Sequence, residues 1–305
     1  MSLGARAAAH AASAAEAQRW QRVQRAGRRW AAWGVALGLA LGTAVNAPAQ
    51  WLGDALQQAS DGRFMLAEAR GSLWNGSAVL VLTGGADSRD ASALPGRLQW
   101  RLRPDWRGLQ LQARQACCLN GDLKFHFQPA WRGFTLSLGD TPGVSGSMPA
   151  PAQTPAPDPS LATVIGQWPA AWLSGLGTPW NTLQLGGLLQ LASPGMQLQS
   201  VHGQLRLDGR LDLELHEVSS RVSTLPSLGS YRLSVQGRGA VSDQAALQLS
   251  TLSGALRLSG SGQWTGSKLR FRGQAQAAPD QAAALSNLLN IIGQRQGALS
   301  VISIG

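Results

Sequence analysis

Residues 97–103 read RLQWRLR, a stretch in which polar and apolar side chains alternate without a break. This alternation is typical of a β-strand with one buried and one wet face, because successive side chains point to opposite sides of a sheet. Burial of Leu98, Trp100 and Leu102 would contribute about 1.5–3 kcal/mol each. A register shift of one residue would bring the arginines inward instead. The stretch therefore predicts both strand structure and register.

The same alternation recurs along the chain, at residues 108–113, 204–207, 211–215, 231–235, 246–249 and 254–258. Asn-Gly and Asp-Gly pairs favour the positive φ values of tight hairpin turns, and the clearest turns are predicted at residues 74–77 and 207–210. Consecutive hairpins build an antiparallel meander. We therefore expect a mainly β fold, with a curved antiparallel sheet that forms a groove or half-pipe.

Helices are predicted at three places outside these strands. Residues 169–176 begin with proline and have glycines near their end, which indicates a short mid-chain helix. Residues 279–292 form a longer C-terminal helix whose leucines and Ile292 recur at helical spacing. We expect this apolar stripe, which consists of Leu285, Leu288, Leu289 and Ile292, to dock against the sheet. A further short helix is predicted at residues 54–60.

The chain of 305 residues is basic, with 26 Lys and Arg against 16 Asp and Glu and a net charge of +10. Half of this excess lies in the first 29 residues, and the rest is spread thinly. A nucleic-acid module would gather its arginines on one face, interleaved with stacking aromatics. We therefore expect no nucleic-acid partner.

Residues 30–50 contain no charged side chain and are about as long as a helix needs to cross a bilayer. We predict a transmembrane signal anchor here. Arginines before the span would keep a basic tail of residues 1–29 in the cytoplasm. The anchor residues are Trp30, Trp33, Leu37, Leu39, Leu41, Val45 and Trp51, and the positive-inside residues are Arg19, Arg22, Arg25, Arg28 and Arg29.

The alternative to an anchor is a cleaved signal peptide, since Ala47-Pro48-Ala49 has small residues in both positions that a cleavage site requires. In either case the body of the chain lies beyond the cytoplasm. This body is divided at residues 140–160, which are rich in proline, alanine, serine and threonine and predict a disordered linker. A first β segment at residues 54–139 precedes the linker. A second, at residues 161–305, follows it and contains the C-terminal helix.

No catalytic motif is found in the sequence. The four histidines have no metal-ligand spacing, and the chain has neither a His-Glu-x-x-His pattern nor a phosphate-binding loop nor a nucleophile elbow. Asp212, Glu214 and Glu217 form the densest carboxylate cluster, and we expect Asp212 and Glu214 on a solvated face paired with arginines. A hydrolase would need a converging histidine, carboxylate and hydroxyl. We therefore predict no enzyme, no cofactor and no metal.

Cys117 and Cys118 are the two cysteines of the chain and are adjacent. In an oxidising compartment they can pair with each other, pair with another chain, or stay buried and reduced. A vicinal disulfide must distort the intervening peptide. A vicinal disulfide at a turn before Asn120-Gly121, two free thiols, and a redox or metal role all stay open.

Several stretches together resemble one protein family, protein N of the bacterial type II secretion system. They are the basic tail and anchor, GSLWNGSA at residues 71–78, LPGRLQW at residues 94–100, Cys117-Cys118, and LLNIIGQR at residues 288–295. The resemblance runs from the anchor to the last residues, apart from the proline-rich insert. It makes Gly71, Trp74, Gly76 and Trp100 the family motif and core residues.

The resemblance implies a non-enzymatic accessory component of the secretion machinery in the inner membrane, with its bulk in the periplasm. Its partners would be other secretion subunits (the inner-membrane platform, the pseudopilus or the secretin) and inner-membrane lipids. Trp106 and Trp131 are the candidate partner surface, since Trp74 and Trp100 suit the core better. The family is also similar to AsmA-like proteins, whose twisted sheets form grooves. The alternative function is therefore the handling of lipids or other hydrophobic ligands.

Overall fold

The computed structural model describes residues 31–131, 133–139, 163–201, 204–238, 242–265 and 268–305. The predicted tail at residues 1–29, its five positive-inside arginines, Trp30 and the linker at residues 140–160 lie outside them. The chain divides into two compact units, Met1–Ala47 and Pro48–Gly305, and each is described by itself.

In the first unit, residues 31–45 are helical, and their apolar side chains are exposed. The helix ends where the Asn46 side-chain amide donates a hydrogen bond of 2.8 Å to the Gly42 carbonyl oxygen. The following Pro48 cannot continue a helical hydrogen-bond pattern. The predicted span at 30–50 is thus interrupted, and a second helix, α2 (Gln50–Ala59), begins just beyond. Of the helices among the described residues, none has both the length and the apolar character needed to cross a membrane.

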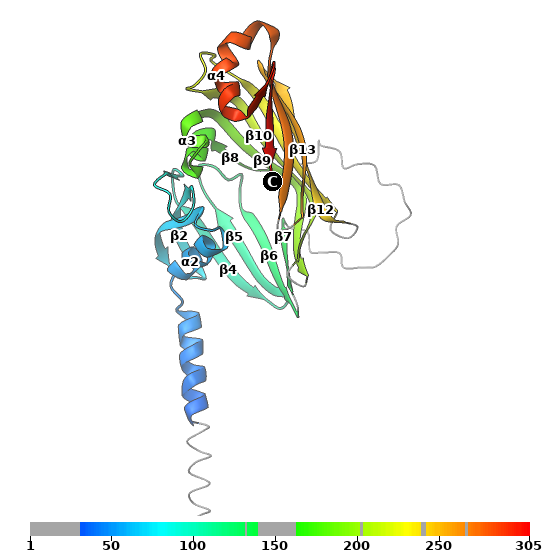
Figure 1. Cartoon of the computed structure of the whole chain (residues 1–305). Coiled ribbons are helices and arrows are strands. Elements are labelled where there is room, and N and C mark those ends of the chain that lie inside the picture. The colour runs from blue at the N-terminus through cyan, green and yellow to red at the C-terminus, as the bar shows by residue number, and fades with distance from the viewer. Residues whose placement is uncertain (1–30, 132, 140–162, 202–203, 239–241, 266–267) are drawn as a thin grey trace, which may run out of the picture. The chain divides into compact units, whose positions relative to one another are not determined.

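In the second unit, the described strands form one open antiparallel sheet (Figure 1). Its first strands are β1 (Phe64–Gly71), β2 (Asn75–Thr83), β3 (Ala91–Ala93), β4 (Leu98–Asp105), β5 (Gly108–Arg114), β6 (Leu123–Ala130) and β7 (Gly133–Leu138). The later strands are β8 (Thr163–Pro169), β9 (Leu185–Val201), β10 (Gln204–Ser220), β11 (Gly229–Arg238), β12 (Ser242–Ser253), β13 (Leu256–Trp264), β14 (Leu269–Ala277), β15 (Gln294–Gln296) and β16 (Leu299–Ile304). The prediction of a mainly β, antiparallel meander is confirmed.

Strands from both sides of the proline-rich segment belong to this one sheet. The C-terminal half of β9 pairs with β7, and its N-terminal half pairs with β8 along the same edge. On its other edge β9 pairs with β10 over nearly its full length. This long pair therefore joins the first and second β segments.

Residues 98–103 of the alternating stretch lie in β4 as predicted, with Trp100 only 3% exposed and Arg101 and Arg103 in solvent, whereas Arg97 precedes the strand. Trp100 pairs with Gly76 of β2, where an added Cβ would lie 2.5 Å from the indole ring. Its Nε1 donates a hydrogen bond of 3.1 Å to the Leu73 carbonyl oxygen. The glycine of the 71–78 motif thus makes room for the tryptophan of the next strand.

Two clusters of buried hydrophobic residues lie on the sheet, one beside α2 and one beneath the C-terminal helix. One contains Trp100 and Ala78, and Leu52 of α2 packs against it. The other lies beneath α4 (Ala282–Ile292), whose Leu285, Leu288 and Leu289 are almost completely buried. The prediction that the C-terminal helix docks on the sheet is therefore confirmed.

The predicted mid-chain helix is also present, as the 3₁₀ helix η2 (Ala170–Leu176), followed by the short helix α3 (Trp180–Leu183). Trp172 Nε1 of η2 donates a hydrogen bond of 3.0 Å to the carbonyl oxygen of Ser92 in β3. Asn181 of α3 donates one of 2.8 Å to the Asp90 carboxylate. These bonds fix the helical segment against the first strands.

One turn prediction is wrong and another is displaced. Residues 207–210 do not form a hairpin turn but lie within β10. Gly209 has φ 102° and faces the backbone of Gly195 in β9 so closely that a side chain would clash. The close approach of two strands, not a turn, requires glycine there. At residues 74–77 the hairpin exists, but Asn75 already opens β2 and the turn precedes it.

The buried stripe of α4 predicts a strong contrast between two substitutions. We expect Leu288→Ala to lower the free energy of unfolding by about 2–5 kcal/mol, because it leaves a cavity in a sealed cluster. Ile291→Ala, on the same helix but 37% exposed, should cost less than about 1 kcal/mol. Urea denaturation of the full chain in detergent measures both. Equal losses would contradict the docking of this helix.

Candidate binding surfaces of the sheet

The register of the sheet brings the apolar residues of its strands to one face. Leu111 of β5 pairs with Phe125 of β6, and Phe127 pairs with Leu136 of β7. Leu136 in turn lies opposite Leu198 of β9. Directly paired residues share a face of a sheet. The apolar face that each strand predicted by itself is therefore continuous across the sheet.

This face is sealed at its ends but not in its middle. α2 packs on β1, and α4 packs on β14, β15 and β16. Between them many apolar side chains of the central strands are only half-buried, although some, such as Leu189 and Leu207, are buried. We call this region the inner apolar face; it comprises Leu109, Leu111, Phe125, Phe127, Phe134, Leu136, Leu198, Leu213, Leu233, Val235, Leu247 and Leu249. A continuous apolar surface of this kind is typical of a site that binds an apolar partner.

The opposite face is polar and ion-paired. Arg210 lies 2.9 Å from the Asp212 carboxylate, and Arg232 lies 2.7 Å from that of Glu214. Asp212 also accepts a hydrogen bond of 2.6 Å from the Ser234 hydroxyl. The expected pairing of these carboxylates with arginines is confirmed, but the expected solvated position is wrong for Asp212, which is only 5% exposed because its partners cover it. They stabilise the polar face and are not arranged as an acid–base couple.

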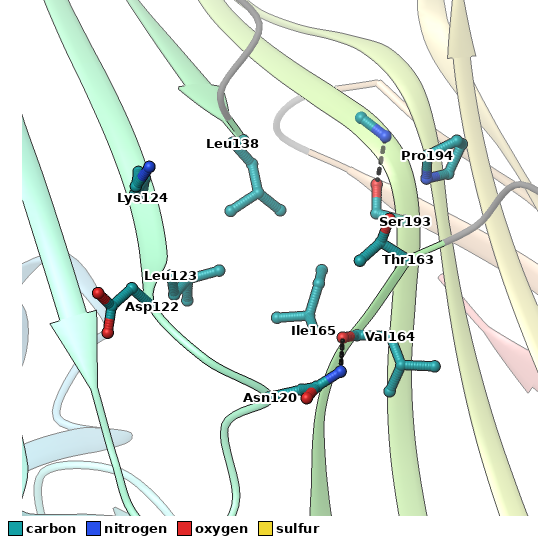
Figure 2. A pocket seen from close by; sticks show the side chains of 12 residues that line it. Asn120, Asp122, Leu123, Lys124, Leu138, Thr163, Val164, Ile165, Ser193 and Pro194 are labelled. Carbon is teal, nitrogen blue, oxygen red and sulfur yellow. Dashed lines mark hydrogen bonds between the residues drawn. The ribbon is translucent and has the colours of Figure 1, made fainter.

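A cavity of about 320 Å³ lies where β7 ends and β8 begins. Figure 2 shows Leu123, Leu138 and Ile165 pointing into it from three different strands. On its walls, the Asn120 amide donates a hydrogen bond of 3.2 Å to the Val164 carbonyl oxygen, and the Ser193 hydroxyl accepts one of 3.1 Å from the Gly195 amide. The polar groups thus hold the walls, and the floor is apolar.

The cavity offers little for catalysis. A hydrogen bond from the Arg114 guanidinium lowers the pKa of the Asp122 carboxyl at its rim, so this group stays ionised and paired. Within the described parts of the chain, no group of three or more His, Cys, Asp or Glu residues could hold a metal ion. The lining therefore combines apolar side chains with the charged groups of Asp122 and Lys124.

Cys117 and Cys118 are joined by a disulfide in the structure, one of the alternatives that the sequence leaves open. The loop that carries them packs against β8, because the Gln167 amide donates a hydrogen bond of 2.7 Å to the Cys118 carbonyl oxygen. Asn120 donates a second one, of 2.9 Å, to Ile165. The vicinal pair therefore lies in the loop that forms one wall of the cavity.

The four tryptophans considered as contact residues divide into two groups. Trp100 is buried in the core, and Trp74 is half-buried, with its carbonyl oxygen accepting a hydrogen bond from the Leu102 amide. Trp106 and Trp131 are 81% and 99% exposed. The two predicted as a partner surface are thus available for contact.

Sequence reasoning found the strands, the exposed tryptophans and an apolar side of the sheet that could line a groove, but missed the cavity. Each strand showed its own apolar side, which was the available signal. The cavity depends on residues from β6, β7, β8 and β9, and the pairing of β7 and β8 with the same edge of β9 brings them together.

Comparison with known proteins gives one match. The family model described as type II secretion system (T2SS), protein N, matches residues 62–301, which is most of the chain. Neither a curated protein nor a solved structure matches it.

The vicinal disulfide predicts a specific pattern of thiol labelling. We expect iodoacetamide to label neither cysteine of the denatured chain before reduction and both after it. After reduction without denaturation, Cys117 should react faster, because it is exposed while Cys118 is only 7% exposed. Peptide mass spectrometry measures both steps, with Cys117→Ser as the control that leaves one thiol free. Full labelling of the unreduced chain would contradict the pairing.

Proposed function

Because the chain belongs to the type II secretion system protein N family, we propose that it is a non-enzymatic scaffold of that machinery in the bacterial inner membrane. Membership makes it a component of protein secretion. The proposal adds a role: a periplasmic sheet that docks other secretion subunits, from the inner-membrane platform, the pseudopilus or the secretin.

The proposed location is a single pass through the inner membrane, with the basic tail in the cytoplasm and residues 48–305 in the periplasm. The helix at residues 31–45 supports it, because Trp33, Leu39 and Val45 are all more than 60% exposed. Such a helix would be costly to leave in water. The paired cysteines agree with an oxidising compartment. A signal anchor that includes the helix at residues 31–45 is therefore our interpretation.

The inner apolar face is the observation that carries the scaffold role. α2 and α4 pack on this face of the sheet, and many apolar side chains between them stay half-buried. The sheet therefore still exposes apolar area that a partner could bury. Burial of such area stabilises a complex by about 25 cal/mol per Å² before the costs of association are subtracted. We propose that a secretion subunit covers this face.

Site-specific crosslinking tests the docking face in cells. The photoreactive residue p-benzoylphenylalanine is placed at position 136, on the inner apolar face, and at position 135, the adjacent residue on the polar face. We expect irradiation to crosslink position 136, but not position 135, to a secretion subunit identified by mass spectrometry. Deletion of the gene should retain exoproteins in the periplasm.

The outcomes of this experiment separate the possibilities. Crosslinks from position 135 alone would move the docking surface to the polar face. Recovery of no secretion subunit from either position, together with normal export in the deletion strain, would overturn the scaffold proposal.

A second candidate function, lipid or hydrophobic-ligand handling, is favoured by the shape and lining of the same surface. The cavity of about 320 Å³ has an apolar floor formed by Leu123, Leu138 and Ile165. Phe127 and Phe134, with ring centroids 5.5 Å apart, lie on the inner apolar face. A curved sheet would make this surface a trough in which an acyl chain could lie.

Native mass spectrometry distinguishes the two functions. If the face binds lipid, the full chain released from detergent should carry a phospholipid adduct that Leu136→Asp removes and Thr135→Asp retains. Adducts that are equal in both variants would come from the membrane helix alone and would contradict lipid handling by the sheet.

A further inference from the structure

Two hairpin tips carry the most exposed large side chains of the sheet. Trp106 lies in the turn between β4 and β5, and Trp131 in the turn between β6 and β7; they are 81% and 99% exposed. The two turns share a sequence pattern, Pro-x-Trp-Arg-Gly, at residues 104–108 and 129–133. We call these two turns the tryptophan tips. A pattern repeated at two turns points to a common role rather than to scattered surface residues.

The tryptophan tips lie at the same end of the sheet. β4, β5, β6 and β7 are consecutive neighbours and antiparallel (Figure 1), so their first and third turns fall on one side. The turn between β1 and β2 lies at this end as well, since the Leu102 amide of β4 donates a hydrogen bond of 2.7 Å to the Trp74 carbonyl oxygen.

The apolar N-terminal helix is connected to the sheet at this same end. Pro48, the first residue of the second unit, forms a β-bridge with Ser72 in the turn between β1 and β2. The Ala49 amide donates a hydrogen bond of 3.2 Å to the Gly71 carbonyl oxygen. The chain therefore passes from the exposed apolar helix at residues 31–45 into the end of the sheet that presents the tips.

The tip at Trp106 combines an indole ring with positive charge. The Arg107 guanidinium carbon lies 4.1 Å from the centroid of the Trp106 ring, within the range of a cation–π contact. The Trp106 amide donates a hydrogen bond of 2.8 Å to the Asp105 carboxylate, which fixes the turn. Arg103 is exposed beside it on β4. Because the Trp106 ring and the Arg107 guanidinium lie side by side, both can contact the same layer of a binding partner.

From these observations we propose that the tryptophan tips insert into the headgroup layer of the membrane that anchors the chain, with Trp106 and Trp131 as interfacial anchors and Arg107 on lipid phosphates. Tryptophan is enriched at membrane–water interfaces because its ring is apolar and its N–H is polar. Arginine beside it is attracted to anionic lipid. The proposal rests on the inner-membrane location proposed above.

A lipid surface fits these tips better than a protein partner does. Hot-spot tryptophans of protein interfaces lie in the centre of a packed patch that excludes water. The described chain neighbours of Trp106 and Trp131 are Asp105, Arg107 and Ala130, and only Ala130 is apolar. Single aromatic side chains on separate tips suit a fluid interface, which needs no matching shape.

Fluorescence quenching in lipid nanodiscs tests the insertion with the full chain. The discs contain phosphatidylethanolamine and anionic phosphatidylglycerol, with or without bromine at acyl carbons 6 and 7. Subtracting the emission of Trp106→Phe or Trp131→Phe from that of the wild type isolates the signal of each tip. Because both side chains are exposed, neither substitution should disturb the fold.

Trp180 provides the matched control. Trp180 is 36% exposed and belongs to α3, which lies next to the start of β9. The other end of β9 lies at a tip, because Val201 pairs with Gly133 there. The 17 residues of β9 place these points roughly 50 Å apart. We expect brominated lipid to reduce the signals of Trp106 and Trp131 at least twofold and to leave that of Trp180 unchanged.

The inner-membrane location and the tip insertion would fail with different experimental results. A chain that alkaline carbonate extracts from native membranes would overturn the inner-membrane location and the tip insertion together. A chain that stays in the membrane, but whose tip signals are quenched no more than that of Trp180, would overturn the insertion alone. Crosslinking of position 131 to a protein rather than to lipid in cells would also overturn it.

Discussion

Cross-strand register holds apolar side chains opposite apolar ones from Leu102 and Leu111 in β4 and β5 to Leu258 and Ala275 in β13 and β14. A strand displaced by one residue would carry its leucines to the polar face and its arginines inward. The two-sided character of the sheet, both hydrophobic clusters and the inner apolar face all depend on this alignment. Glycines permit this register where backbones or rings approach so closely that a side chain would clash. Gly76 beneath Trp100 is one example.

The helices α2 and α4 cover parts of the apolar face of the sheet, and the rest of that face lies outside these two helices. α2 and α4 each cover one end, where side chains such as Leu285 and Trp100 are sealed from water. Many leucines and phenylalanines of the central strands, such as Leu136 and Phe127, are only half-buried. If the whole apolar face served only to stabilise the fold, we would expect other elements of the chain to cover its middle as well. The half-buried middle is the apolar area that the proposed secretion partner would cover.

The polar face and the sheet ends have different uses. Ion pairs such as Arg232 with Glu214 occupy the polar face. The end that carries Trp106 and Trp131 is also the end where Pro48 joins the chain to the apolar helix. The two proposals therefore place the membrane contact and the docking of a partner on separate surfaces. A partner on the inner apolar face need not compete with the membrane for the tips.

Local pattern in the sequence determined the amphipathic strands, the buried stripe of the C-terminal helix and the exposure of Trp106 and Trp131. It misplaced residues 207–210, because an Asp-Gly pair looks the same in a turn and in a strand that approaches its neighbour closely. Only the tertiary structure decided that β7 and β8 share one edge of β9, that the separate apolar sides merge into one face, and that the two tryptophan tips point the same way. The reason is physical: period two is a property of a single strand, whereas register and order are set by pairing between strands that lie far apart in the chain.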